Sequence, residues 1–121
     1  MLPKERFEAA MQHRQPDDMV AFMELEFQLY EYIGKKIISG YEFQRLTSAE
    51  KNKALYINAE IMVETAEKAG HDAIRDIGGY WEVAGHPAEL WLPDLESRLG
   101  QIEALKKVAG DNYFIIGTLV H

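Results

Sequence analysis

Short apolar runs of strand length alternate with longer segments of helical periodicity, and this order constrains the fold more than any other feature of the chain. The segments follow one another as helix 3–14, run 19–23, helix 25–37, helix 47–69, run 71–77, helix 93–109 and run 113–120. Strands separated by amphipathic helices are typical of βαβ units with parallel strands. We therefore expect an α/β fold, an N-terminal helix followed by β-α-β-α-β, in a single unit spanning residues 1–121.

The clearest helix boundaries in the sequence are those of one helix, which is predicted to begin at Thr47 and to end before Gly70. Thr47 and Glu50 have the spacing of a capping box, in which each side chain bonds the backbone N–H of the other residue. Gly70 suits the left-handed residue that follows a helix. We expect the other helices to bury apolar stripes. These are Phe7, Ala10 and Met11 in the first helix, Leu25, Leu29 and Ile37 in the next, and Leu95, Leu99, Ile102, Leu105 and Val108 in the last.

The final run, 113–120, is almost entirely apolar, as expected for a strand covered on both faces. No helical segment follows it in this chain, and three parallel strands leave two open edges. Residues 80–84 are compatible with either a further short strand or a loop. We expect the chain to be the opening part of a larger fold or one half of a tight homo-oligomer.

Charge and composition exclude several classes of function. Thirteen Lys and Arg against 20 Asp and Glu give a net charge of −7, which disfavours nucleic acid as a partner. The chain has no cysteine, so disulfides and thiolate zinc ligands are excluded. No apolar run approaches the roughly 18 residues of a membrane span, and the first residues lack a signal-peptide core. We expect no membrane partner and a cytoplasmic location.

Three segments together resemble the uroporphyrinogen decarboxylase superfamily: Pro3–Ala10 with Gln15–Asp17, a short run ending in Phe22-Met23, and Gly110–Gly117. The resemblance covers the whole chain, which corresponds to about the first third of a typical member. It implies that the chain forms the first part of a (β/α)8 TIM barrel. The superfamily contains porphyrinogen decarboxylases and corrinoid-dependent methyltransferases.

The two branches differ directly after Phe22-Met23. True decarboxylases place substrate-binding arginines there, whereas this chain has Glu24 and Gln28 at the matching positions. An acidic side chain facing the substrate's carboxylates would repel them. The resemblance therefore favours the methyltransferase-like branch. Its zinc ligands lie in the later part of the barrel, so corrinoid and zinc are implied for a full-length relative and no cofactor for this chain alone.

Candidate site residues lie where the strands of such a barrel end. We assign Asp76 as the catalytic candidate, and Glu24, Glu26, Tyr80 and His86 as substrate-binding candidates; no residue is assigned to a metal. Each has a plain structural alternative: a loop acid capping a backbone amide, a ring packed on a rim, or a solvated imidazole. The four histidines are not spaced to form a helical metal site.

Three functions remain open. The first is the N-terminal portion of a methyltransferase-like enzyme, inactive as this fragment, whose partner is the rest of the barrel and whose substrate is a small molecule or a corrinoid protein. The second is a stand-alone α/β interaction or oligomerisation module without catalysis. The third is a uroporphyrinogen decarboxylase proper.

Overall fold

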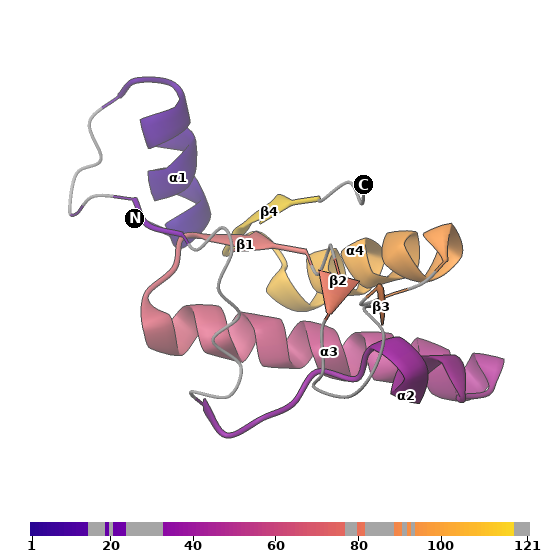
Figure 1. Cartoon of the computed structure of the whole chain (residues 1–121). Coiled ribbons are helices and arrows are strands. Elements are labelled where there is room, and N and C mark those ends of the chain that lie inside the picture. Colours follow the sequence, from indigo (N-terminus) through magenta and orange to yellow (C-terminus); the bar gives the residue numbers. More distant parts are fainter. Residues whose placement is uncertain are drawn as a thin grey trace.

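The computed structural model describes residues 1–14, 19, 21–23, 33–76, 80–81, 89–90, 92 and 94–117. The part of the chain that it describes folds into helices and short strands (Figure 1). In chain order these elements are α1 (Pro3–Met11), α2 (Gly40–Gln44), α3 (Ser48–Ala69), β1 (Ala73–Arg75), β2 (Tyr80–Trp81), β3 (Glu89–Leu90), α4 (Leu95–Ala109) and β4 (Phe114–Ile116). The fold is therefore mixed and compatible with the expected α/β class, although the described elements do not alternate strictly: α1, α2 and α3 all precede β1.

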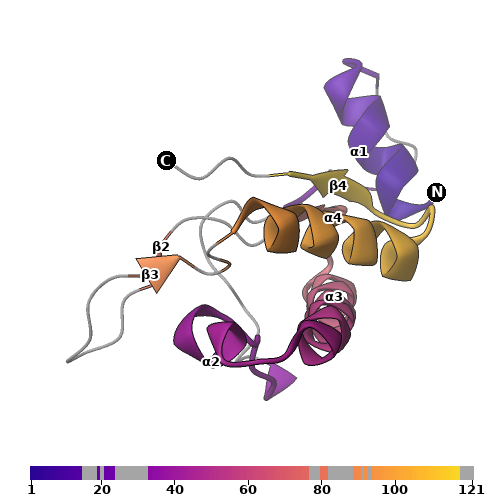
Figure 2. The ribbon, with the colours of Figure 1, turned by 90° about the vertical axis from the view of Figure 1, so that its right-hand side faces the viewer.

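The central sheet consists of β1 and β4, which pair in parallel. Ile74 lies opposite Ile115 in the register, and α4 belongs to the connection between the two strands. Helices α3 and α4 lie on one side of this sheet and α1 on the other (Figures 1 and 2). Ile74 belongs to the hydrophobic core that the sheet forms with α3 and α4, and Ile115 packs against this core. The expected parallel pairing is thus confirmed for 71–77 and 113–120, although both strands are shorter than those runs.

Strands β2 and β3 form a separate antiparallel pair, in which Tyr80 lies opposite Leu90. The sequence left residues 80–84 open between strand and loop, and the structure assigns a strand to the first two of them. The sequence did not predict β3 as the strand that pairs with β2. Two-residue strands offer too little periodicity to be recognised in a sequence.

Helix α3 begins and ends where the sequence predicts. The Thr47 hydroxyl accepts a hydrogen bond from the Glu50 amide at 3.2 Å, and the Glu50 carboxylate accepts one from the Thr47 amide at 3.1 Å. Gly70 follows the helix with a φ of +78°, which an L side chain would strain. Because these signals involve only neighbouring residues, they can be recognised without knowing the fold.

Helices α3 and α4 form the main packing interface, and it is close. A Cβ atom placed on Gly100 would lie only 2.9 Å from Leu55 Cδ1. The buried residues of the two helices meet here, among them Leu55, Ala59, Met62, Ala104 and Leu105. This apolar surface, together with Ile37 and Phe43 from the preceding segment, makes up most of the core.

A buried polar cluster joins the same two helices to residues 35–39. Asn58 is fully buried; its amide group donates to the Ile38 carbonyl at 2.9 Å and its oxygen accepts from the Ile38 N–H at 2.8 Å. It also donates to Gln101 Oε1 at 3.2 Å, and Gln101 Nε2 donates to the Leu55 carbonyl at 2.8 Å. Asn58 thereby makes the two backbone hydrogen bonds that a neighbouring strand would make to Ile38, and it holds residues 35–39 against α3.

The predicted apolar face of α1 is wrong in part. Ala9 is buried as an apolar residue, but the other buried position is Arg6, while Met11 is 62% exposed. Phe7 packs on Phe114 of β4 with the ring centroids 4.9 Å apart. The ion pair of Arg6 with the buried Asp72 sets the rotation of the helix, and the apolar periodicity of so short a helix cannot compete with a buried charge.

Two segments before α3 also differ from the prediction. Residues 21–23 form no strand, although Phe22 exchanges hydrogen bonds with Asp72: its N–H donates to Asp72 Oδ2 at 2.6 Å and its carbonyl accepts from the Asp72 N–H at 2.6 Å. Residues 24–32, most of the helix predicted at 25–37, lie outside the described residues. Residues 35–39 are not helical, and Gly40 begins α2.

The predicted inward face of α4 is wrong at its first two positions. Leu95 and Leu99 are 62% and 54% exposed. Leu105 is buried as predicted and Val108 packs against the core, but the other buried positions are Ser97, Gln101, Ala104 and Ala109. The approach of α3 is closest at Gly100, where even a Cβ atom would lie 2.9 Å from Leu55 Cδ1, so a larger side chain at that position would not fit. None of the helices in the described part of the chain has both the length and the apolar character needed to cross a membrane.

Asp94, predicted at the start of α4, caps the helix and leads to a testable pH dependence. Partial burial by itself would raise its pKa, but hydrogen bonds from the Ser97 amide at 2.7 Å and hydroxyl at 2.9 Å outweigh burial and hold the pKa below its ordinary 3.8. A lowered pKa stabilises the fold above the unfolded-state value, and this contribution is lost as the pH falls through the folded-state value.

We expect Asp94→Ala to lower the free energy of unfolding at neutral pH by about 1 kcal/mol. Asp94→Asn should lose less, because asparagine is an equally good cap. The deficit of the alanine variant should shrink as the pH falls from the ordinary pKa of 3.8 through the lowered folded-state pKa, where the wild-type carboxylate of the folded protein becomes protonated. Urea denaturation at several pH values measures both effects. An equal deficit at neutral pH and at pH well below 3 would contradict the assignment.

Candidate functional site

The carboxyl ends of the two parallel strands meet at Asp76. Strand β1 ends at Arg75, and the N–H of the next residue, Asp76, donates to the Ile116 carbonyl at the end of β4 at 2.8 Å. The parallel ladder thus continues one residue past β1 and fixes the backbone of Asp76 at this edge. Asp76 therefore lies directly after β1, at the strand end where the sequence places it.

Asp76 is nearly inaccessible, with 1% of its surface exposed. A carboxyl group is rarely buried to this extent without hydrogen bonds or charges that hold it. At the carboxyl edge of a parallel sheet, such a group can hold a proton or accept a hydrogen bond from a ligand amine or amide. Its position and its burial together make it the best-supported catalytic candidate among the described residues.

The end of β4 packs against α4 beside this edge. Gly117 follows the strand, and a Cβ atom at its position would lie 3.4 Å from Ile102 Cδ1. Helix α4 therefore runs back along β4, with its first turns near the carboxyl ends of the strands. The adjacent Thr118 lies outside the described residues.

The other predicted site residues are only partly covered. The backbone of Tyr80 lies in β2, which Figure 1 shows beyond the carboxyl end of β1 and on the same side of the molecule as that end. Glu24, Glu26 and His86 lie outside the described residues. The expected convergence of Glu24, Asp76 and Tyr80 on one end of the sheet is therefore tested only for the last two, which do lie at that end.

The amino end of the sheet carries a buried ion pair that the sequence did not reveal. Asp72 is 1% exposed, and its carboxylate binds the guanidinium of Arg6 through one oxygen and the Phe22 N–H through the other. The Arg6 guanidinium also donates to the Met1 carbonyl at 3.4 Å. These contacts join α1, residues 21–23 and β1. Because both carboxylate oxygens of Asp72 are engaged by groups of the chain itself, we interpret this pair as structural.

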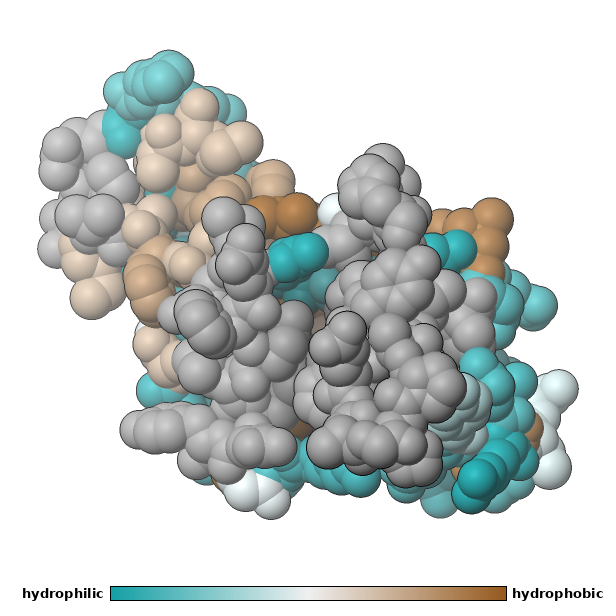
Figure 3. Space-filling model, viewed as in Figure 1, coloured by the Kyte–Doolittle hydropathy of each residue, from teal (hydrophilic) through white to brown (hydrophobic). Residues whose placement is uncertain are grey.

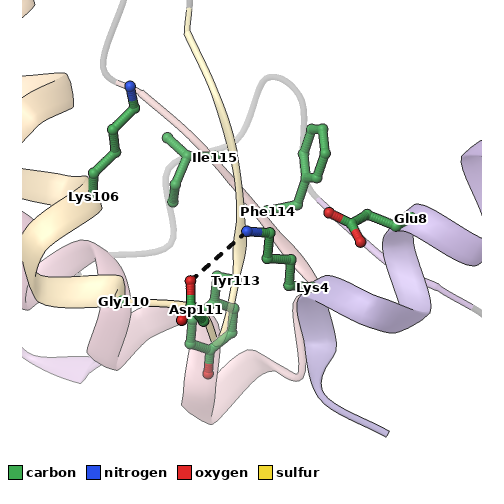
Figure 4. A pocket seen from close by; sticks show the side chains of 8 residues that line it. All are labelled: Lys4, Glu8, Lys106, Gly110, Asp111, Tyr113, Phe114 and Ile115. Carbon is green, nitrogen blue, oxygen red and sulfur yellow. Dashed lines mark ion pairs between the residues drawn. The ribbon is translucent and has the colours of Figure 1, made fainter.

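A groove runs along the edge of β4 that faces away from β1 (Figure 4). Its volume is about 520 Å³. Residues from α1, the end of α4 and β4 line it: Lys4, Glu8, Lys106, Gly110, Asp111, Tyr113, Phe114 and Ile115. Burial, reinforced by the nearby Glu67 and Asp72 carboxylates, raises the pKa of the Tyr113 phenol and keeps it neutral. The sequence indicated an open strand edge here but not a groove.

The described residues contain no group of three or more His, Cys, Asp or Glu side chains that could hold a metal ion. No protein-family model matches the chain, and neither a curated protein nor a solved structure does. What bears on function is the geometry of two places, the carboxyl edge around Asp76 and the groove beside β4.

Proposed function

We propose that the chain is the N-terminal portion of a (β/α)8 barrel of the uroporphyrinogen decarboxylase superfamily, in the branch of the corrinoid-dependent methyltransferases. One observation carries the proposal: a buried carboxyl group, Asp76, ends a strand that pairs in parallel with a second strand through a connection containing α4. This is the arrangement in which barrel enzymes carry their catalytic groups.

In this proposal Asp76 is the catalytic residue, and Glu24, Glu26, Tyr80 and His86 contribute to substrate binding. The substrate is a small molecule or a corrinoid protein. Active sites of such barrels draw residues from several strands, so we expect no catalysis from these 121 residues alone. Corrinoid and zinc would be held by other parts of the barrel, and we derive no reaction step through either of them.

The proposal predicts that Asp76→Asn impairs methyl transfer in the intact protein. Loss of a general acid or base costs about 100-fold or more in rate. The measurement follows demethylation of methylcobalamin by its visible absorbance, with small thiols and amines as methyl acceptors. Asp111→Asn is the matched control, because its side chain is 97% exposed and lies at the amino end of β4.

Two results would contradict the proposal. The first is unchanged methyl transfer in Asp76→Asn, with circular dichroism confirming that both variants are folded. The second is decarboxylation of uroporphyrinogen by the 121-residue chain, followed by chromatography of the porphyrin products. That activity would favour the decarboxylase branch despite Glu24 and Gln28.

A second candidate function, an interaction module without catalysis, is favoured by a different observation. Leu95 and Leu99 are more than half exposed on α4, although large apolar side chains at adjacent helical positions are normally buried. An exposed apolar stripe is typical of a surface that binds another protein. The experiment below tests this candidate separately from the enzymatic one.

A further inference from the structure

An apolar stripe and an open strand edge form one continuous surface. Residues 95, 99, 102 and 106 follow each other at spacings of four, three and four, which places them on one face of α4. Leu95 and Leu99 are exposed, and Ile102 is half-buried beside Gly117 at the end of β4. Lys106, the last member, lines the groove beside β4. Figure 3 shows hydrophobic surface both where β4 runs and at the right-hand end of α4.

The open edge of β4 presents backbone groups suited to a further strand. The Phe114 N–H donates to the Asp72 carbonyl and the Ile116 carbonyl accepts from the Asp76 N–H, so both residues direct their backbone groups toward β1. By the alternation of a strand, the N–H and carbonyl of Ile115 point away from β1, into the groove. Within the described residues, β1 is the sole strand paired with β4. A strand added at this edge would provide hydrogen-bond partners for the N–H and the carbonyl of Ile115.

The charges on α4 and in the groove favour a second copy of this chain as the partner that binds this surface. Helix α4 has acidic residues at its start, Asp94 and Glu96, and basic residues at its end, Lys106 and Lys107. A second α4 running antiparallel to it would place acid against base at both ends, whereas a parallel one would place like charges together. The groove is balanced in the same way, with Lys4 and Lys106 against Glu8 and Asp111. In a chain of net charge −7, this surface is complementary to itself.

We propose that two copies of this chain form a two-fold symmetric dimer in which β4 pairs antiparallel with β4 of the second copy and the two α4 stripes pack against each other. A two-fold axis requires a self-complementary surface, which this one is. The sheet becomes continuous in the order β1-β4-β4-β1, and both exposed leucines become buried. The dimer is independent of the role proposed for Asp76, because it uses neither that residue nor the carboxyl edge. It does use the edge of β4 that the next strand of a barrel would occupy, so it is proposed for these 121 residues without the rest of a barrel.

Sedimentation equilibrium of the chain at micromolar concentrations tests the proposal. We expect twice the 13.9 kDa of one chain. Leu99→Glu should weaken dimerisation by about 100-fold or more, since it buries a charge at the centre of the interface. Ile57→Glu is the control: Ile57 is 37% exposed on α3, outside the stripe, and this variant should remain dimeric.

Charge reversal tests the antiparallel arrangement itself. Glu96→Lys and Lys106→Glu should each weaken dimerisation by roughly threefold to tenfold, and the double variant should restore it, because opposite charges again face each other. Circular dichroism checks that every variant is folded. If the wild-type chain is monomeric, the proposal is overturned. The surface would then be available to another partner. The proposal is equally overturned if Leu99→Glu dimerises like the wild type, or if the double reversal is as weak as the sum of its parts.

Discussion

Asp72→Ala is expected to lower the free energy of unfolding by about 3–5 kcal/mol, the range for removing one partner of a buried ion pair. The change leaves the Arg6 guanidinium, whose side chain is 10% exposed, without its carboxylate. It also removes the acceptor of the Phe22 N–H. Three segments lose their common contact, so α1 and residues 21–23 should loosen together. Urea denaturation followed by circular dichroism, at one fixed protein concentration, measures the loss.

The control for this prediction is Asp111→Ala, which removes the partner of Lys4 in an ion pair of 4.0 Å at a 97% exposed side chain. Exposed pairs contribute little, so we expect a change under about 1 kcal/mol. The double variant Arg6→Met with Asp72→Leu should be more stable than Asp72→Ala, because it leaves no unpaired charge buried. If Asp72→Ala is no less stable than Asp111→Ala, the ion pair does not hold α1 to the sheet.

Asn58→Ala is expected to cost a similar amount, about 3–5 kcal/mol. Alanine removes the groups that bond the N–H and the carbonyl of Ile38 and the side-chain oxygen of Gln101. Each buried polar group left without a partner carries a penalty of about 1–3 kcal/mol. The same urea denaturation measures the loss, and residues 35–39 should become susceptible to proteolysis because Asn58 no longer holds them.

Asn52→Ala provides a matched control on the same helix, since Asn52 is exposed. It should be neutral or slightly stabilising, because alanine is the better helix former. The double variant Asn58→Ala with Gln101→Ala should lose less than the sum of the two single losses, by at least about 0.5 kcal/mol, since the two side chains share a hydrogen bond. Strict additivity would mean that the cluster does not act as one unit.

Sequence reasoning located the carboxyl edge of the sheet better than the residues around it. Asp76 could be placed because a run of strand length precedes it and parallel strands end on the same side. The groove beside β4 could not be found in this way, because it depends on where α1 and the end of α4 lie relative to the strand. Asn58 and Gln101 left a trace, since both fall in phase with the buried residues of their helices.

The sequence by itself determined the local structure: the capping box at Thr47, the left-handed Gly70, the cap at Asp94, and the alternation that makes β1 and β4 parallel. Each depends on residues within a few positions, or on a period that survives in any context. Tertiary structure decided which face each helix buries. In α4 the close approach of α3 at Gly100 turns Leu95 and Leu99 outward while Leu105 is buried, and in α1 the buried carboxylate of Asp72, just before β1, selects Arg6 over Met11. The free energy of a packed interface or a buried ion pair depends on the partner surface, which no local pattern specifies.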